Sequence, residues 1–392
     1  MSPDQQALDQ ARSPCAKSGD VTRVQRASTS LDTNGSAADL TYSTYALGIG
    51  ERADNADAAK IDAYVRTNAD ATPFHMTSWS RAVARGCGHI NHYLVAQEGS
   101  AIVGVLPLTA VHSPLFGRAL VSSAFAVGGG VLADDKVIGA AMVAKAVALA
   151  ERLSCPTVEL RGGMMVDGEG WYHDSSTYLG FVRDLASDDE AELLAIPRKQ
   201  RAEVRRALGF ELTVETGSSA RDREAHYEVY SESVRNLGTP VFPRGLFDAV
   251  LDEFGDDADI LTIRQGGIAI ASVISLYWRG TVMPYWGGGT AAARQWRAND
   301  LMYFALMNHA RARGCTRFDF GRSKAGTGPA AFKHNWGFEA QPLAYAKHAA
   351  DGEVPRDINP LNPKYRLQVA LWQRLPLRLA NRIGPLIARG LG

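Results

Sequence analysis

The stretch FDFGRSKAGTGPAAFKHNWGF, residues 318–338, decides the fold. It begins with a strand-like alternation that puts Phe318 and Phe320 on one face and Asp319 and Gly321 on the other. A loop of glycines and small residues follows, then a short helical segment that carries Lys333 and ends in Trp-Gly-Phe, and a last strand at 339–349 is expected after it. The apolar face can pack in a core, while the other face can border a cleft.

The chain repeats one unit, and this stretch belongs to the second copy. Residues 93–108 (YLVAQEGSAIVGVLPL) align without a gap with residues 261–276 (LTIRQGGIAIASVISL), and each segment reads as two strands joined by a glycine-containing turn. In both copies a strand ending in three glycines comes next, followed by a helix and a short strand. The glycine triplets lie at 128–130 and 287–289, the helices at 140–155 and 299–315, and the short strands at 157–163 and 317–323. The shared order predicts a tandem duplication.

The predicted fold class is α/β (mixed α+β), because each copy gives a mixed sheet flanked by helices. This order resembles the acyltransferase fold of the Gcn5-related N-acetyltransferase (GNAT) superfamily. We therefore expect two tandem acyl-CoA N-acyltransferase (GNAT-like) domains, at residues 41–188 and 189–350. The resemblance implies that the central strands splay apart and that the backbone exposed between them pairs with an acyl donor. Residues 1–40 are predicted to be disordered, and residues 351–392 to form a basic amphipathic tail.

One segment departs from the superfamily pattern. The usual pyrophosphate loop places x-x-Gly-x-Gly after a basic or Gln residue at the start of the main helix. Residues 288–301 (GGTAAARQWRANDL) instead carry their glycines earlier and have Arg294 and Arg297 in the loop. This departure argues against the superfamily's usual mode of coenzyme A binding, and no tightly bound cofactor is expected.

Composition narrows the cellular setting. The 42 basic and 42 acidic residues balance, which gives the whole molecule no general attraction to nucleic acid or anionic lipid. The four cysteines are far apart and form no C-x-x-C pair, so we expect neither a metal site nor a disulfide scaffold. The N-terminus does not read as a secretory signal, and no apolar run reaches the ~18 residues of a membrane span. We expect a cytoplasmic protein, with the inner face of the membrane as the alternative location.

The block FDFGRS…GTG…FKHNWGF closely resembles the C-terminal signature of FemAB-type transferases. Together with IPRKQRAEVRRAL (196–208) and the NPLNPKYR…LP…GP tail, it resembles the FemAB-like proteins associated with exosortase and PEP-CTERM systems, of BioF2-like acetyltransferase type. The resemblance covers most of the chain from about residue 70 onward. It implies transfer of an aminoacyl group from charged tRNA to an amine on a cell-wall precursor, so the acyl donor is left open between aminoacyl-tRNA and acyl-CoA. For the exosortase-associated branch it implies a link to exopolysaccharide genes.

Lys333 is the catalytic candidate. Acyl transfer to an amine passes through a tetrahedral oxyanion, which a preorganised cation stabilises. Lys333 lies between Phe332 and the Trp-Gly-Phe turn, where apolar neighbours strengthen its field and lower its pKa. The resemblance also implies that this lysine lies near the reacting ester; the alternative is a surface lysine on a short amphipathic helix. Asp319 is the candidate proton acceptor or orienter of the amine, unless it only pairs with Arg317 or Arg322.

Substrate-binding residues are predicted around these two. Gly321 allows positive φ and close approach of a ligand, as a flexible loop would also do. The glycines that follow Tyr285 and Trp286 end a strand just before the main helix, where this fold binds its donor. Asn299 near the helix start is either a ligand contact or a helix cap. The complete set in this region is Tyr285, Trp286, Gly287, Gly288, Asn299, Gly321, Arg322, Ser323, Phe332 and Trp336.

A basic helix is predicted at residues 197–208. Arg198, Arg201 and Arg205 share one face, a fork suited to phosphate oxygens of a nucleotide-linked precursor or of tRNA; a solvated helix between the domains is the alternative. His75 is expected to be structural rather than a base. The first domain lacks the Phe-Lys block, so we expect catalysis in the second domain and the acceptor in the first.

The tail at 355–392 has seven cations and one acid among Leu, Trp and Ile. It is expected to be broken by Pro376 and Pro385 and to dock on the protein body; peripheral membrane contact is the alternative. The predicted function is an acyl or aminoacyl transferase that forms an amide on a cell-envelope or exopolysaccharide precursor, a small molecule or a lipid- or nucleotide-linked sugar. The rivals are a CoA-dependent N-acyltransferase on an amino sugar and a non-catalytic binding protein. The oligomeric state stays open.

Overall fold

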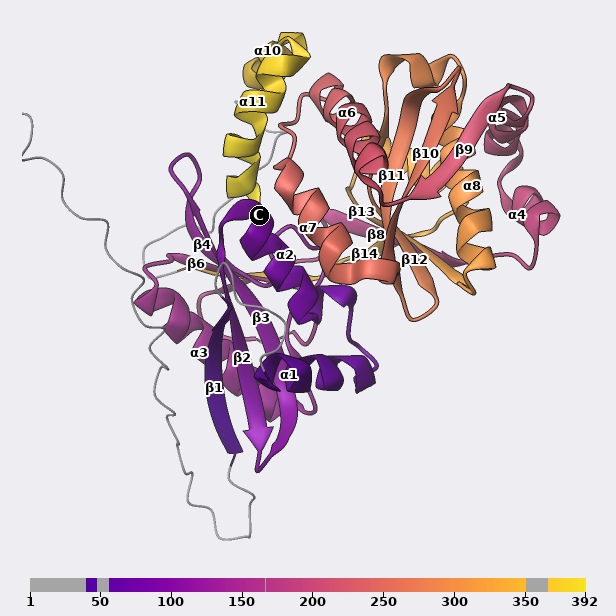
Figure 1. Cartoon of the computed structure of the whole chain (residues 1–392). Helices are drawn as coiled ribbons and strands as arrows, with labels where there is room; N and C mark the ends of the chain where they lie inside the picture. The colour runs from indigo at the N-terminus through magenta and orange to yellow at the C-terminus, as the bar shows by residue number, and fades with distance from the viewer. Residues whose placement is uncertain (1–39, 48–55, 166, 350–365) are drawn as a thin grey trace, which may run out of the picture.

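The computed structural model describes residues 40–47, 56–165, 167–349 and 366–392, and two mixed sheets with helices packed on them form its framework (Figure 1). In strand order, the first sheet consists of β1 (Leu40–Leu47), β2 (Ile90–Glu98), β3 (Ala101–Ser113), β4 (Gly117–Val121), β6 (Thr157–Arg161), β15 (Tyr345–Ala349) and β7 (Trp171–Asp174), with β5 (Leu132–Ala133) beside β3. The second consists of β14 (Ala340–Pro342), β8 (Tyr178–Asp184), β13 (Arg317–Lys324), β12 (Thr281–Gly289), β11 (Ile268–Trp278), β10 (Ala258–Gln265) and β9 (Leu212–Gly217). The predicted class of two tandem GNAT-like units is confirmed.

Local capping fixes where several helices begin. Asp135 accepts the N–H of Ile138 at the start of α3, and Ser219 with Asp222 forms a capping box at the start of α6. The helices are α1 (Ala56–Thr67), α2 (Thr77–Cys87), α3 (Lys136–Arg152), α4 (Asp189–Ala195), α5 (Arg198–Leu208), α6 (Ala220–Asn236), α7 (Arg244–Phe254), α8 (Ala298–Ala312), α9 (Gly328–Asn335), α10 (Arg366–Arg374) and α11 (Leu377–Ala388). None of these described helices is long and apolar enough to cross a membrane.

The two central strands of each sheet separate after a short contact. β12 and β13 run parallel and pair at two positions only, ending at Val282 and Phe318. β4 and β6 do the same in the first sheet, ending at Val121 and Glu159. Beyond Phe318, β13 pairs with β8, while β12 continues along β11. Beyond these positions the facing edges of β12 and β13 are unpaired with each other, which is the splay that the resemblance to the GNAT superfamily implied.

The two halves exchange their last strands. β8 precedes residue 188 but lies between β13 and β14 in the second sheet. β15 comes from the second half of the chain but lies between β6 and β7 in the first sheet. The segment 339–349, expected as one strand, is thus two short strands in different sheets, because each half completes the other's sheet. The sequence division at 188/189 did not anticipate this exchange.

Two further expectations about single elements were wrong. The first glycine triplet, 128–130, lies in the connection between β4 and β5, whereas the second does end β12. Pro385 lies inside α11 and does not break it, while Pro376 is the residue before its first turn. A proline removes one helix hydrogen bond, a loss that the packing of α11 on α6 offsets. The disorder predicted for residues 1–40 and the start of the tail, 351–365, fall outside the described residues, apart from Leu40 in β1.

One hydrophobic core joins the halves. Trp79 of α2 is fully buried and stacks on Trp286 of β12, with ring centroids 6.0 Å apart. The helices α2 and α7 pack closely because Gly86 faces the backbone of α7. A Cβ added to Gly86 would lie 2.6 Å from the backbone nitrogen of Leu246. This contact between α2 and α7 fixes the position of one sheet relative to the other.

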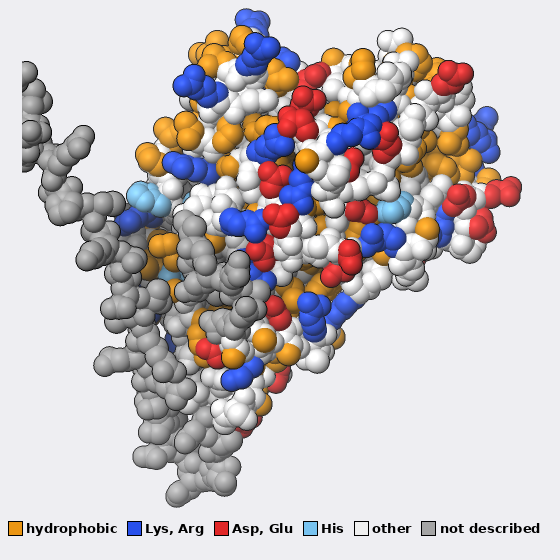
Figure 2. All heavy atoms as spheres, in the orientation of Figure 1, with side chains coloured by type: hydrophobic (Ala, Val, Ile, Leu, Met, Phe, Trp, Pro, Cys, Tyr) orange, Lys and Arg blue, Asp and Glu red, His pale blue; other side chains and the backbone are white. Residues whose placement is uncertain are grey.

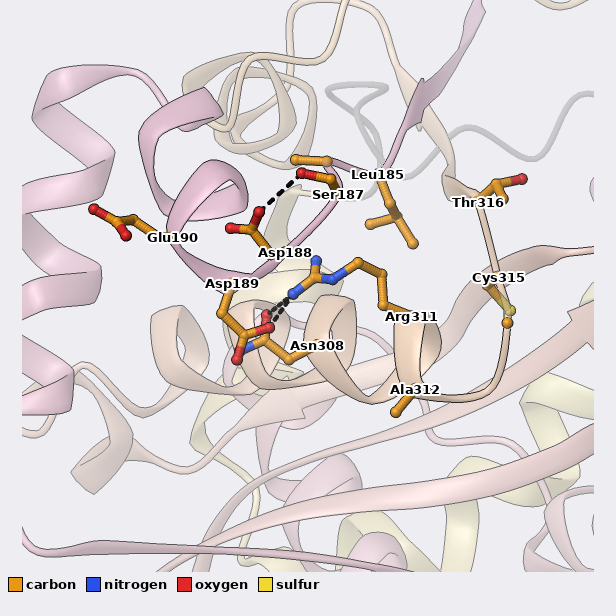
Figure 3. Close-up of a pocket in the computed structure, with 12 residues that line it drawn as sticks. Leu185, Ser187, Asp188, Asp189, Glu190, Asn308, Arg311, Ala312, Cys315 and Thr316 are labelled. Atoms are coloured by element: carbon orange, nitrogen blue, oxygen red, sulfur yellow. Dashed lines mark hydrogen bonds and ion pairs between the residues drawn. The ribbon is translucent and has the colours of Figure 1, made fainter.

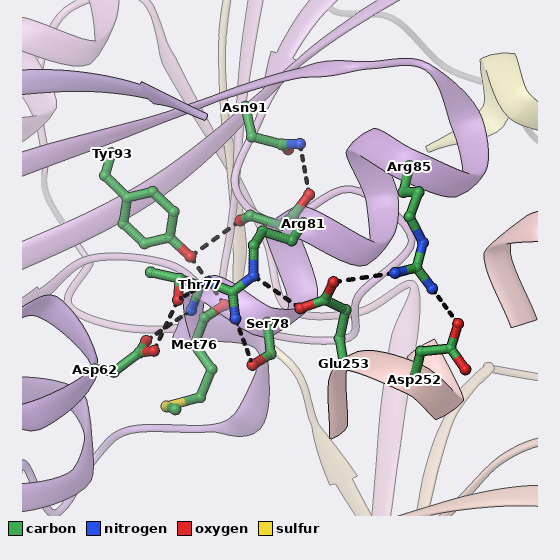
Figure 4. Close-up of polar contacts among 11 residues, drawn as sticks. Asp62, Met76, Thr77, Ser78, Arg81, Arg85, Asn91, Tyr93, Asp252 and Glu253 are labelled. Atoms are coloured by element: carbon green, nitrogen blue, oxygen red, sulfur yellow. Dashed lines mark hydrogen bonds and ion pairs between the residues drawn. The ribbon is translucent and has the colours of Figure 1, made fainter. Parts of the chain in front are cut away.

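Ion pairs border the same contact (Figure 4). Arg81 of α2 donates to Glu253 of α7 at 2.8 Å, and Arg85 pairs with both Glu253 and Asp252. Arg81 and Glu253 are mostly buried, while Arg85 and Asp252 are about half exposed. The exposed pair contributes little to stability, so we assign the register of the two helices chiefly to the glycine contact and to the Arg81–Glu253 pair.

Gly86→Ala should weaken the contact between α2 and α7. The added methyl group meets backbone rather than a flexible side chain, and such overpacking costs about 1–3 kcal/mol. Gly128→Ala is the matched control, because the nearest atom to its Cβ would be 3.7 Å away. Denaturant unfolding should show a lower free energy of unfolding for Gly86→Ala only; equal values for both variants would refute the close-contact account.

Candidate active site

β13 contains a bulge at the predicted site. Its ladder with β8 shifts between Asp319 and Arg322, so Phe320 and Gly321 together oppose the single residue Phe181. Gly321 has φ +68°, in the left-handed region that glycine enters without strain. The Gly321 N–H donates to Asp319 Oδ1 at 2.8 Å. One oxygen of Asp319 therefore holds the bulge in place.

The Lys333 ammonium lies on this bulge. Nζ donates to the carbonyl oxygens of Gly321 at 3.1 Å and Arg322 at 2.9 Å. It also lies 5.4 Å from the ring centroid of Phe181 and 5.5 Å from that of Phe320, within the range of cation–π attraction. An ammonium carries three N–H donors, and two are used here. The third N–H has no hydrogen-bond partner in the part of the chain that the structure describes.

Burial shifts the pKa values of the two candidate catalytic groups in opposite directions. It lowers the pKa of Lys333 to about 8, although the Asp319 carboxylate opposes the shift. Burial raises the pKa of Asp319, while the Gly321 N–H and the charges of Lys333 and Arg317 act against it. Arg317 lies 3.6 Å from Asp184 and takes that residue as its ion-pair partner. Asp319 is thus a stronger base than an ordinary exposed aspartate.

Arg322 points into a group of tyrosines from both exchanged strands. Its Nη1 donates to Tyr345 Oη at 3.0 Å, and its guanidinium lies 4.9 Å from the centroid of the Tyr178 ring. The Tyr345 hydroxyl donates in turn to the carbonyl oxygen of Val127 at 2.8 Å. Arg322 therefore does not pair with Asp319. Tyr178 and Tyr345 were not among the predicted site residues, since only the strand exchange brings them here.

Ser323 of β13 and Trp336, the residue after α9, are both buried. Neither Ser323 Oγ nor Trp336 Nε1 has a hydrogen-bond partner among the described residues. Phe332 is partly buried, with its ring 6.2 Å from that of Trp336 and 5.7 Å from that of Tyr303. These aromatic contacts hold α9 against β13 and so fix the position of Lys333.

Tyr285 and Trp286 lie in the core between the halves. The Tyr285 hydroxyl donates to the carbonyl oxygen of Phe125 at 2.7 Å, and its ring packs on Trp79 at 5.4 Å. Trp286 is 4% exposed. Both residues support the splayed part of β12 from the side of the first half.

Helix side chains already lie against the glycines that end β12. A Cβ on Gly287 would lie 3.2 Å from Tyr303 Oη, and one on Gly288 would lie 2.6 Å from Ser233 Cβ. The glycines are therefore needed for close packing of α6 and α8 on β12. This requirement accounts for them whether or not a donor also touches their backbone.

Asn299 lies in the first turn of α8 and is not its cap. The residue before the helix is Arg297, in a left-handed conformation with φ +52°, and it makes no side-chain capping bond. The Asn299 side chain faces Gly289, and its Oδ1 has no hydrogen-bond partner in the part of the chain that the structure describes. An unpartnered buried oxygen at this helix start is suited to receive an N–H or O–H from a ligand.

The three cations predicted to form a fork on α5 separate in the structure. Arg201 donates to the carbonyl oxygen of Leu194 at 3.1 Å and closes the turn between α4 and α5. Arg198 and Arg205 are exposed, and neither has an ion-pair partner within the described ranges. Their helix packs on α8. The exposed phosphate-binding candidates are therefore Arg198 and Arg205.

A known protein family matches the part of the chain that contains the candidate site. The sequence model of the "Acetyltransferase (GNAT) domain" family matches residues 196–334, which include α5, the splayed strands and Lys333. The second half is a GNAT-type acyltransferase domain. The protein is accordingly an acyltransferase. No curated protein matches the sequence.

Solved structures share the fold of this acyltransferase. FemX superposes with a TM-score of 0.60 at 15% identity, covering 77% of this chain and 96% of FemX. A tandem GNAT protein from the clavulanic acid biosynthesis pathway gives 0.51 at 13% identity, with 80% and 100% covered. The C-terminal domain of a putative lysylphosphatidylglycerol synthetase from Agrobacterium fabrum gives 0.50 at 14%, with 75% and 92% covered. Identities this low establish the fold alone.

A separate hollow of about 900 Å³ lies at the other end of α8 (Figure 3). Acids at the start of α4 line it, and Arg311 crosses it to pair with Asp189 and Glu192. None of the predicted site residues lines it. The hollow is therefore separate from the candidate site at the bulge of β13.

His75 is held in a structural role. Its Nδ1 lies 3.0 Å from the backbone nitrogen of Thr72, its Nε2 lies 3.1 Å from the carbonyl oxygen of Gly130, and burial lowers its pKa to about 4. A histidine with both ring nitrogens occupied cannot also accept a substrate proton. Within the described residues no group of His, Cys, Asp and Glu could hold a metal ion.

Gly321→Ala should disturb the bulge and the carbonyl oxygens that hold Lys333. A side chain at φ +68° costs about 1–2 kcal/mol of unfolding free energy. Gly326→Ala is the control, since Gly326 has φ +72° and equally open surroundings but no contact with Lys333. Both variants should be similarly destabilised in thermal unfolding, whereas Gly321→Ala alone should lose most acyl transfer. Equal activities in the two variants would contradict the role of the bulge.

Proposed function

We propose that this acyltransferase forms an amide by transferring an acyl or aminoacyl group to an amine of a cell-envelope or exopolysaccharide precursor, in the manner of FemAB enzymes. The observation that carries the proposal is the position of Lys333. Its ammonium is fixed by two carbonyl oxygens of β13, the strand that separates from β12, and its third N–H has no partner among the described residues. A carbonyl group bound between β12 and β13 would meet a preorganised cation.

The proposed step uses Lys333 and Asp319. The acceptor amine attacks the carbonyl carbon of the donor, and the N–C bond forms as the carbonyl oxygen becomes an oxyanion. Lys333 donates a hydrogen bond to that oxygen and keeps its proton. The intermediate then expels the ribose oxygen of a tRNA ester or the sulfur of a thioester. Asp319 accepts the proton that the amine loses and passes it to the departing oxygen or sulfur, which leaves as the alcohol or thiol; its raised pKa favours this role.

The donor distinguishes the main proposal from its rival. A GNAT domain match at residues 196–334 supports acyl-CoA, and hence an N-acyltransferase acting on an amino sugar. The shared fold with FemX and with a protein named as a putative lysylphosphatidylglycerol synthetase supports aminoacyl transfer. Exposed Arg198 and Arg205 beside α8 suit phosphates of either donor. The start of α8 is less suited to a pyrophosphate, because Asp300 lies in its first turn, bonded to Gln200 at 2.6 Å.

The cellular setting rests on sequence resemblance. The blocks at 196–208 and 318–338 support the exosortase- and PEP-CTERM-associated branch, and through it an exopolysaccharide precursor as the acceptor. The third reading, a non-catalytic binding protein, is disfavoured by the GNAT domain match together with the intact Lys333 site.

Donor binding should be measured first, with charged tRNA and acetyl-CoA in parallel assays. The FemAB-type proposal expects salt-sensitive binding of charged tRNA that weakens about tenfold or more in Arg198→Gln/Arg205→Gln. Arg66→Gln/Arg118→Gln is the control, since both cations are exposed in the first half. Saturable binding of acetyl-CoA without affinity for tRNA would replace the proposal with the amino-sugar N-acyltransferase.

Lys333→Met should lower the rate of amide formation by about 10²–10³-fold, the loss typical of one oxyanion donor. The wild-type rate should also fall as pH rises through about 8, because Lys333 acts only while protonated and its pKa is lowered to that value. Lys333→Met should lack this alkaline fall. Lys136→Met, which removes an exposed lysine of α3, should leave the profile unchanged. Activity of Lys333→Met within threefold of wild type would refute the proposed role.

A further inference from the structure

The C-terminal helices divide into a docked face and an exposed face. On α11 the small residues Ala380 and Gly384 are buried, and a Cβ on Gly384 would lie 3.1 Å from the backbone nitrogen of Val241. Asn381 donates to Ser231 of α6 at 3.1 Å. The segment is therefore fixed on the protein body by its small side chains. The larger side chains of α11 are left to face elsewhere.

The exposed face is aliphatic. Leu379, Ile383 and Leu386 recur at the spacing of one helical face, and they are 41%, 36% and 63% exposed. On α10, Leu367 and Leu371 are 71% and 57% exposed. Figure 1 shows α10 and α11 standing together at one end of the molecule, and Figure 2 shows hydrophobic side chains gathered there. Single exposed leucines are common, but five on two adjacent helices form a patch that marks an interaction surface.

The charges around this patch have one sign. Residues 366–392 contain five arginines and neither Asp nor Glu, although the whole chain is neutral. Arg374, Arg378 and Arg382 are exposed, and none of them forms an ion pair in the described part of the chain. Figure 2 shows Lys and Arg side chains at the same end of the molecule. The surface thus combines aliphatic side chains with unneutralised cations.

We propose that this face of α10 and α11 binds an anionic membrane surface, with its leucines in the boundary between headgroups and acyl chains. Aliphatic side chains beside arginines match both layers of such a surface. A symmetric pair of chains would instead bring the arginines of one copy against those of the other, which is unfavourable. Docking on the body and membrane contact are compatible, because they use different faces of α11. The proposal does not depend on which acyl donor the enzyme uses.

The test is sedimentation of the full-length protein with vesicles of phosphatidylcholine alone and of phosphatidylcholine with 30 mol% phosphatidylglycerol, a composition of about physiological charge. We expect binding to the anionic vesicles only, weakened by added salt. Arg378→Gln/Arg382→Gln should weaken it by about tenfold or more, since each cation near such a surface contributes about fivefold. Leu379→Gln/Leu386→Gln should also weaken binding while leaving the free energy of unfolding unchanged.

Two controls separate this face from general charge or hydrophobicity. Arg66→Gln/Arg118→Gln removes two exposed cations elsewhere, and Val137→Gln removes a 76% exposed aliphatic side chain on α3. Both should bind as wild type. Equal binding to neutral and anionic vesicles, or equal loss in the controls, would overturn the proposal. A third result would also overturn it: wild-type protein that does not bind vesicles and forms a dimer in sedimentation velocity, when Leu379→Gln/Leu386→Gln is a monomer.

Discussion

The insertion of β8 between β13 and β14 is the constraint on which the site depends. β8 comes from the first half of the chain, and its pairing with β13 creates the bulge opposite Phe181. The bulge turns two carbonyl oxygens toward Lys333, and the Phe181 ring lies beneath the ammonium. Without this strand β13 would have no partner opposite the bulge, and the ammonium would lose the Phe181 ring that helps to bury it. The proposed site in the second half therefore depends on the first half for its geometry.

The reciprocal insertion of β15 gives the first half the same dependence. Tyr345 on β15 links Arg322 of the second sheet to the carbonyl oxygen of Val127 in the first half. The core around Trp79 and Trp286, together with the glycine contact of α2 with α7, holds the sheets in one arrangement. An acceptor bound on the first half would thus keep a fixed distance from the Lys333 ammonium, as acyl transfer between two bound substrates requires.

Much of the fold could be predicted from local patterns. Alternation along 317–323 predicted that Phe318 and Phe320 are buried, and they are. The internal repeat predicted two equivalent sheets, because a duplicated sequence repeats its hairpins and helices, and the resemblance to the GNAT superfamily implied their splayed central strands. The strand exchange could not be predicted, since β8 and β15 have the same sequence character whichever sheet they join. For the same reason the contacts of Arg322 with Tyr178 and Tyr345 were missed. The predicted fork of cations on α5 rested on helical spacing alone. Spacing does not reveal that Arg201 donates a hydrogen bond to the carbonyl oxygen of Leu194.

The most direct test of the account is the pKa of the Lys333 side chain, measured by NMR on protein with labelled lysine amines and assigned with Lys333→Met. We expect a value of about 8, well below the usual lysine value near 10.4. Asp319→Asn should lower it further, because the Asp319 carboxylate raises the pKa of Lys333. A value near 10.4 that does not respond to Asp319→Asn would mean that Lys333 is a solvated surface lysine, and the proposed site would be wrong.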